Sequence, residues 1–141
     1  MPILNYTTTI DAEKTLAQIR KILVNQGATK IVTDYKDKIP VSVTFAIELN
    51  NQLIPYSLPA NYQGVLSTLK KDKKVQNKYK SEEQAVRIAW RIIKDWIEAQ
   101  MAIVQSELAE LQEVFLPYMV TKRGNTLYKE FKENKTLLLG E

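Results

Sequence analysis

The sequence predicts a single α+β domain over residues 1–141, with an N-terminal helix, a three-stranded antiparallel meander, a long C-terminal amphipathic helix and a short terminal helix. Three observations lead to this class. Apolar residues recur at helical spacing over residues 9–26 and again over residues 81–116. Between these stretches, residues 39–49 alternate between large apolar side chains and smaller or polar ones, which is typical of a half-buried strand. A length of 141 residues suits one domain with a sizeable core.

The first helix is expected over residues 9–26. Leu16, Ile19 and Leu23 share one helical face, and Gly27 stands where a residue with positive φ commonly ends a helix. The preceding residues 3–9 are β-rich enough to favour a short edge strand.

Three strands are expected next, at residues 28–35, 39–49 and 52–58. Asn50 and Asn51 tolerate positive φ, so they favour a tight hairpin turn between the second and third strands. Pro55 has no N–H for the ladder, which places the third strand at an edge. The expected sheet is therefore an antiparallel meander with one solvated face.

Two helices are expected after the sheet. Proline is well tolerated in a first helical turn, so Pro59 is expected to begin the shorter one. The longer one begins at a capping box, in which the Ser81 hydroxyl accepts from the Gln84 N–H and the Gln84 amide returns to the serine N–H. Pro117 is expected to end it.

The length of this helix predicts a homo-oligomer. About 35 residues make roughly 50 Å of helix, whereas a compact domain of this size has a radius of gyration of about 14–15 Å. Either the helix kinks, or its far end projects and packs against another subunit. We favour the second interpretation and expect a dimer or a higher oligomer.

The C-terminal residues predict a short helix and an apolar tail. Residues 126–134 place Leu127 and Phe131 four apart on one helical face. The tail at 137–141, LLLGE, is apolar enough that we expect it to dock on the core or on a neighbouring subunit.

The composition excludes several kinds of chemistry. The chain has no cysteine and no histidine, so disulfides, thiolate nucleophiles, Cys/His zinc sites and Ser-His-Asp catalysis are ruled out. We therefore expect a protein that is not an enzyme and has no cofactor. No run of eighteen apolar residues and no signal-like N-terminus is present, so a cytoplasmic location without membrane contact is expected.

Positive charge concentrates in one short stretch. Residues 70–80 hold six lysines and one aspartate, whereas the whole chain has a net charge of only +4. Such a cluster can neutralise phosphates, and an aromatic ring within it can stack on a base. The alternative is a solvated loop between two helices, which is the commoner role of a short charge run. The candidate residues are Lys70, Lys71, Lys73, Lys74, Lys78, Tyr79 and Lys80.

A second basic feature follows on the long helix, where Arg87, Arg91 and Lys94 are spaced four and three apart on one face. Together with the lysine cluster they could form one continuous basic surface for phosphate. The alternative is a polar face held by the i,i+4 pairs Arg91–Asp95 and Lys94–Glu98.

An acidic row lies further along the same helix, at Glu107, Glu110 and Glu113. One row of carboxylates without convergent ligands is not a metal cage, so we expect a solvated face and no metal site.

The segments SEEQAVRIAWRIIKDWIEAQMAIV, SLPAN and FLPYM together carry a resemblance. With them the chain resembles small uncharacterised proteins encoded in bacteriophages, prophages and related mobile elements, over most of residues 5–131. The resemblance implies an accessory role, which in such proteins is commonly nucleic-acid binding or the blocking of a host defence. It would place the protein in the cytoplasm of the host cell.

Two functions are therefore predicted. The leading one is binding of nucleic acid through the lysine cluster and the Arg87, Arg91 and Lys94 face, with phosphate neutralisation and little base readout. The alternative is a host-defence inhibitor whose oligomer binds a host protein or sequesters a phosphorylated nucleotide in a basic pocket.

Overall fold

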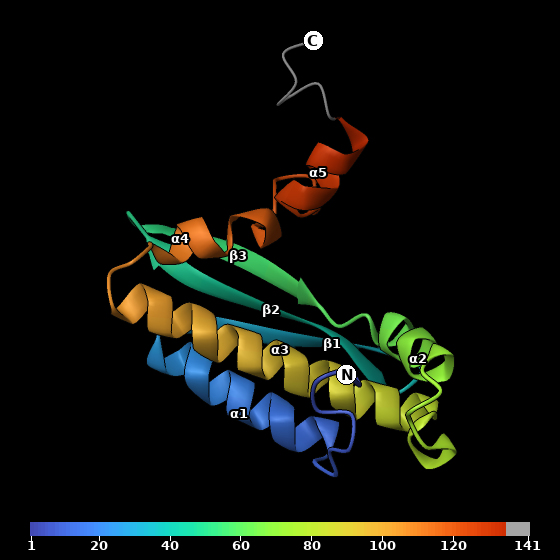
Figure 1. Ribbon diagram of the computed structural model, residues 1–141. Coiled ribbons are helices and arrows are strands. Elements are labelled where there is room, and N and C mark those ends of the chain that lie inside the picture. The colour runs from blue at the N-terminus through green and yellow to red at the C-terminus, as the bar shows by residue number, and fades with distance from the viewer. Residues whose placement is uncertain (135–141) are drawn as a thin grey trace.

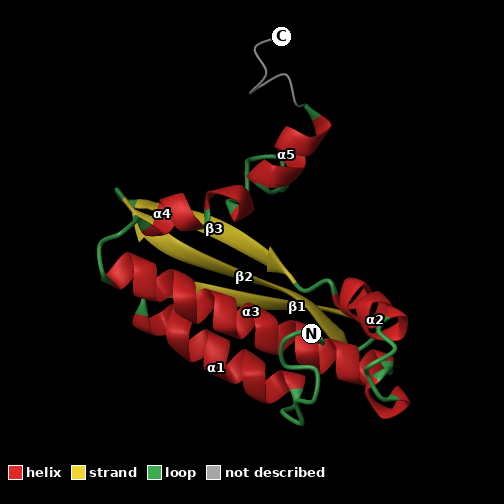
Figure 2. Cartoon of the chain, viewed as in Figure 1, coloured by secondary structure: helices red, strands yellow, loops and turns green. Residues whose placement is uncertain are grey.

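The structure is a computed structural model, and it describes residues 1–134 (Figures 1 and 2). The predicted α+β class, with its N-terminal helix, three-stranded antiparallel sheet, long helix and short terminal helix, is confirmed. In chain order the elements are α1 (Ala12–Asn25), β1 (Ala28–Lys36), β2 (Ile39–Leu49), β3 (Gln52–Pro59), α2 (Tyr62–Lys71), a 3-10 turn (Asn77–Tyr79), α3 (Glu82–Gln105), α4 (Leu111–Val114), a second 3-10 turn (Leu116–Tyr118) and α5 (Leu127–Glu133).

The sheet is a meander in the order β1-β2-β3, with both neighbouring pairs antiparallel. The predicted turn at Asn50 and Asn51 is confirmed, because both residues have positive φ, at 52° and 65°. The β1–β2 turn uses the same geometry at Asp37 and Lys38. Pro55 lies in β3, an edge strand as predicted, and its carbonyl accepts from the backbone N–H of Val120.

Helices α1 and α3 lie side by side on one face of the sheet and run in the same direction (Figure 1). The core lies between these helices and the sheet. Trp90 is fully buried there, and its indole N–H donates to the carbonyl oxygen of Pro40 at 3.1 Å. The other large core side chains are Leu16, Ile19, Leu23, Val43, Phe45, Tyr56, Leu58, Ile97 and Phe115.

At the outer edge of β1, Tyr35 reaches α1. Its hydroxyl donates to the Glu13 carboxylate at 2.7 Å, and this hydrogen bond raises the pKa of Tyr35 above its usual value. On the same face, Arg20 of α1 contacts the hydroxyl of Thr33 at 3.4 Å.

A second, smaller apolar cluster joins α2 to the beginning of α3. Its buried members are Leu69, Val75, Ala85 and Ile88. Helix α2 begins at Tyr62 and not at Pro59, which ends β3; Asn61 caps the helix by accepting from the Gly64 N–H at 3.1 Å.

The N-terminal segment packs against this second cluster through Ile3 and Tyr6. The predicted strand at residues 3–9 is therefore wrong, since the segment forms turns and crosses α3. The Asn5 side chain donates to the Asp95 carboxylate at 2.9 Å, which fixes the crossing on one side.

Helix α3 ends earlier than predicted. Its last residue is Gln105, and Glu107 has a left-handed φ of 62°. The N–H groups of Glu107 and Leu108 donate to the carbonyls of Val104 and Ile103, which is the Schellman pattern of a helix end. With 24 residues the helix is roughly 36 Å long.

After this break the chain folds back, and α4 brings Phe115 into the core. The single helix predicted over 81–116 is wrong beyond Gln105. The projecting helix end on which the predicted oligomer rested is therefore not observed.

The predicted short helix near the C-terminus is confirmed as α5, and Thr126 caps it by accepting from the Lys129 N–H at 3.2 Å. Within the described chain α5 extends away from the body of the molecule (Figure 1), and none of its residues is buried. The predicted docking of the tail at 137–141 lies outside the described residues. Between residues 1 and 134, no helix is long and apolar enough to cross a bilayer.

Candidate functional site: the lysine loop

The lysine-rich stretch, residues 70–80 and here called the lysine loop, lies at one end of the molecule between α2 and α3 (Figure 1). Lys70 and Lys71 form the last turn of α2, where positive charge also suits the negative end of the helix dipole. Lys80 is half-buried. Five ammonium groups are exposed and have no carboxylate partner among the described residues, namely those of Lys70, Lys71, Lys73, Lys74 and Lys78.

The backbone of the lysine loop is anchored to the body. Val75 is only 3% exposed and belongs to the second apolar cluster. The Asp72 carboxylate accepts from the backbone N–H of Lys74 at 2.9 Å, so the one acidic residue of the loop shapes the turn. The lysines are therefore presented from a fixed backbone, which reduces the entropy lost when a ligand binds.

Tyr79 is part of this anchor. Its ring is half-buried and meets the ring of Tyr6 edge-on, with centroids 5.6 Å apart. The Lys78 ammonium lies 5.1 Å from the centroid of the same ring. These two contacts use part of the Tyr79 ring, and its predicted stacking role stays a prediction.

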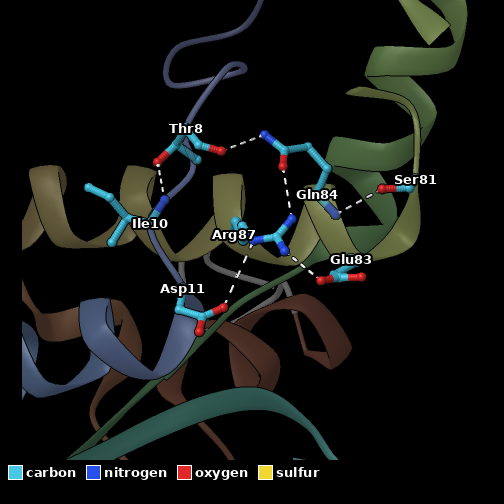
Figure 3. Close-up of polar contacts among 7 residues, drawn as sticks. All are labelled: Thr8, Ile10, Asp11, Ser81, Glu83, Gln84 and Arg87. Atoms are coloured by element: carbon cyan, nitrogen blue, oxygen red, sulfur yellow. Dashed lines mark hydrogen bonds and ion pairs between the residues drawn. The ribbon is translucent and has the colours of Figure 1, made fainter. Parts of the chain in front are cut away.

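Arg87 has partners within the chain. Its guanidinium forms ion pairs with Glu83 and, at 4.0 Å, with Asp11, and it donates to the amide oxygen of Gln84 at 3.0 Å (Figure 3). It therefore links the start of α1 to the first turn of α3.

Gln84 was expected to complete a capping box, and half of that expectation is confirmed. The Ser81 hydroxyl accepts from the Gln84 N–H at 3.1 Å. The Gln84 amide does not return to Ser81, because it donates instead to the carbonyls of Tyr6 and Thr8 at 3.0 and 2.9 Å. Figure 3 shows Gln84 between Ser81, Thr8 and Arg87.

Arg91 and Lys94 also have partners within the chain. Arg91 donates to the side chains of Gln18 and Thr15 on α1, at 2.6 and 3.3 Å. The predicted Arg91–Asp95 pair is wrong, because Asp95 accepts from the N-terminal segment instead. The predicted Lys94–Glu98 pair is confirmed at 2.6 Å.

The two basic features therefore differ in how many of their charged groups are free to contact a ligand. Five lysines of the lysine loop are exposed and have no carboxylate partner among the described residues, whereas Arg87, Arg91 and Lys94 hold α1 and α3 together or pair along α3. A role for these three residues in ligand binding stays a prediction, and it would require breaking the contacts described above.

One cavity lies beside Arg87, with a volume of about 270 Å³. It is bounded by the start of α1, the β1–β2 turn and the start of α3. Its charged lining consists of three carboxylates and two cations, namely Asp11, Glu82, Glu83, Lys38 and Arg87. This lining does not favour an anion over a neutral ligand.

The acidic row is split between two elements. Glu107 lies in the turn after α3, whereas Glu110 caps α4 and its backbone N–H donates to the Glu113 carboxylate at 3.2 Å. Within residues 1–134, no group of three or more acidic side chains is placed to hold a metal ion.

The packing roles of Gln18 and Gln84 were missed by the sequence reasoning. Gln84 is only 6% exposed and immediately precedes the apolar stretch that begins at Ala85. A polar residue next to such an apolar stretch is the one sign in the sequence that Gln84 is buried and hydrogen-bonded. The sequence alone does not identify its partners.

Comparison with protein-family models, with curated proteins and with solved structures finds no match for this chain.

Proposed function

We propose that this protein is a non-enzymatic binding protein that contacts nucleic acid through the lysine loop. The observation that carries the proposal is a set of five exposed lysines that have no carboxylate partner within residues 1–134, on a loop whose backbone is anchored by Val75 and Asp72. Ammonium groups held in this way suit the phosphate backbone, which attracts cations regardless of base sequence.

The proposed site is smaller than the combined basic surface that the sequence predicts. The Arg87, Arg91 and Lys94 side chains have partners within the chain, so we assign the electrostatic contact to the lysine loop alone. If all five exposed lysines release counterions from duplex DNA, log Kobs against log salt should have a slope of about −4.5.

The alternative, sequestration of a phosphorylated nucleotide, needs a concave site with an excess of cations. The cavity beside Arg87 has more carboxylates than cations, so it supports this function less well than the lysine loop supports nucleic-acid binding. An accessory role in a mobile element remains compatible with either function.

The test measures binding of the protein to duplex DNA, single-stranded DNA and RNA by fluorescence anisotropy over a series of salt concentrations. The test variant is the double substitution Lys73→Gln and Lys74→Gln, which removes two exposed charges and leaves Val75 and Asp72 in place. We expect weaker binding to all sequences and a salt slope smaller in magnitude by about 1.8 for duplex DNA.

The matched control is Lys14→Gln with Lys21→Gln, which removes two exposed charges from α1. Equal losses in the two double variants would show that only net charge matters and would contradict a site at the lysine loop. Absence of binding to all three nucleic acids at low salt would end the proposal.

A further inference from the structure

Strand β1 leaves one edge of the sheet open. The strand pairs with β2 on one side, and within the described chain no backbone group hydrogen-bonds to its other side. Such an edge presents a row of free N–H and C=O groups that can pair with another strand. The register with β2 is irregular at Ala28/Lys30 and at Asp34/Tyr35, so the regular part of β1 is residues 30–34.

The side chains of this regular segment alternate between the two faces of the sheet. Ile31 and Thr33 point toward α1, since Ile31 packs on the core and Thr33 contacts Arg20. Lys30, Val32 and Asp34 point to the opposite face, where the Ser42 hydroxyl of β2 donates to the Asp34 carboxylate at 2.9 Å.

The three residues on the open face are complementary to themselves. If two copies of β1 pair antiparallel with a two-fold axis at Val32, residue numbers opposite each other sum to 64. Lys30 of one copy then lies opposite Asp34 of the other, on both sides of a central Val32 pair. Opposite charges placed directly across a sheet stabilise it, and like charges in the same positions destabilise it.

The exposure of two β1 side chains also favours pairing between two copies of this strand. Val32 is 55% exposed and Tyr35 is 51% exposed, although both belong to a strand. In the two-fold arrangement, Val32 meets its own copy and Tyr35 lies opposite Thr29. On the helical face, Ile31 lies opposite Thr33. No position in this register brings two like charges together.

We propose that the free edge of β1 pairs with β1 of a second copy of this chain, which joins the two sheets into one antiparallel six-stranded sheet. The interface is isologous, as expected for a two-fold dimer. It differs from the helix-mediated dimer that the sequence suggested, and it does not depend on the function proposed for the lysine loop.

A charge exchange tests the register. In Lys30→Asp, two aspartates face each other on both sides of the axis, and in Asp34→Lys two lysines do. We expect each single variant to dimerise roughly tenfold or more weakly than the wild type in sedimentation equilibrium. A mixture of the two single variants, and the double variant Lys30→Asp/Asp34→Lys, should both restore dimerisation, because opposite charges again face each other.

A cross-link tests the position of the axis. The chain contains no cysteine, so Val32→Cys introduces a single thiol, and the axis places the two copies of residue 32 directly opposite each other. Mild oxidation should give a disulfide-linked dimer. The matched control is Val24→Cys on α1, where the native side chain is 57% exposed, and it should form no disulfide-linked dimer under the same conditions.

Three results would overturn the proposal. The first is a wild-type protein that stays monomeric at every concentration. The second is a dimer that neither single charge variant weakens, because its interface then lies elsewhere. The third is equal cross-linking at positions 32 and 24, which would reflect random collision of exposed thiols.

Discussion

The Gln84 side chain ties the N-terminal segment to α3. Its amide nitrogen donates to the carbonyls of Tyr6 and Thr8, and its amide oxygen accepts from Arg87. Gln84 is only 6% exposed and the carbonyls belong to half-buried residues, so removing this side chain would take a donor from two partly buried acceptors. It is thus the main polar link between the N-terminal segment and α3.

We expect Gln84→Ala to lower the free energy of unfolding by about 1–3 kcal/mol, because it leaves partly buried acceptors without a donor. Urea denaturation measures this change, and amide exchange should show reduced protection at the start of the chain. Gln63→Ala is the control, since Gln63 is exposed on α2 and its replacement should change stability by less than about 0.5 kcal/mol. Equal effects in the two variants would contradict the role given to Gln84.

At the scale of elements, the end of α3 determines the shape of the molecule. Leu108, Leu111 and Phe115 continue the apolar spacing of α3, yet Leu108 is 78% exposed whereas Phe115 is fully buried. On one straight helix these residues would share a face. They do not share it, because Leu108 lies in the turn after α3, whereas Leu111 and Phe115 belong to the separate turn of helix α4 and its C-cap.

Glutamate has a Cβ and is strained at the left-handed φ of Glu107, whereas glycine adopts it at little cost. We therefore expect Glu107→Gly to raise the free energy of unfolding by up to about 1 kcal/mol, measured by thermal and urea denaturation. Glu107→Ala keeps the strained backbone with a Cβ and should give no such gain. If the alanine variant gained as much as the glycine variant, loss of the acidic charge would be the cause.

At the scale of the whole molecule, a packed body carries a C-terminal arm (residues 121–134). The body contains both apolar clusters. The arm contacts the body near the 3-10 turn Leu116–Tyr118, and its helix α5 buries no residue. The stability of the molecule therefore resides in the body.

Two phenylalanines allow a matched comparison between body and arm. Phe115 is fully buried among aromatic rings in the core, whereas Phe131 is half-buried on α5. We expect Phe115→Ala to cost about 3–5 kcal/mol of unfolding free energy, and Phe131→Ala less than about 1 kcal/mol. Urea denaturation of the two variants checks this, and a large loss in Phe131→Ala would show that the arm is an integral part of the core.

Patterns local in the chain were sufficient for most of the fold. The period-two alternation of residues 39–49 and the pair Asn50-Asn51 predicted β2 and its hairpin. Gly27 marked the end of α1, with φ of 103°. The lysine loop was identified by composition alone, because charge density needs no knowledge of tertiary contacts.

The predictions that were wrong depended on contacts between residues far apart in the chain. Arg91 has a helical neighbour at Asp95, but the structure gives it Gln18 and Thr15, which are more than 70 residues away in the chain. The N-terminal segment resembled a strand locally, but it packs against α3, where Gln84 donates to its carbonyls.

The sequence by itself determined the α+β class, the three strands and the position of the concentrated positive charge, because each depends on spacing or composition within a few turns of chain. Only the tertiary structure decided where α3 stops, which cations remain unpaired and which sheet edge stays open. The end of α3, the unpaired cations and the open sheet edge all depend on how segments far apart in the chain pack together. The preference of a single residue for a helix or for an ion pair is too weak to determine that packing.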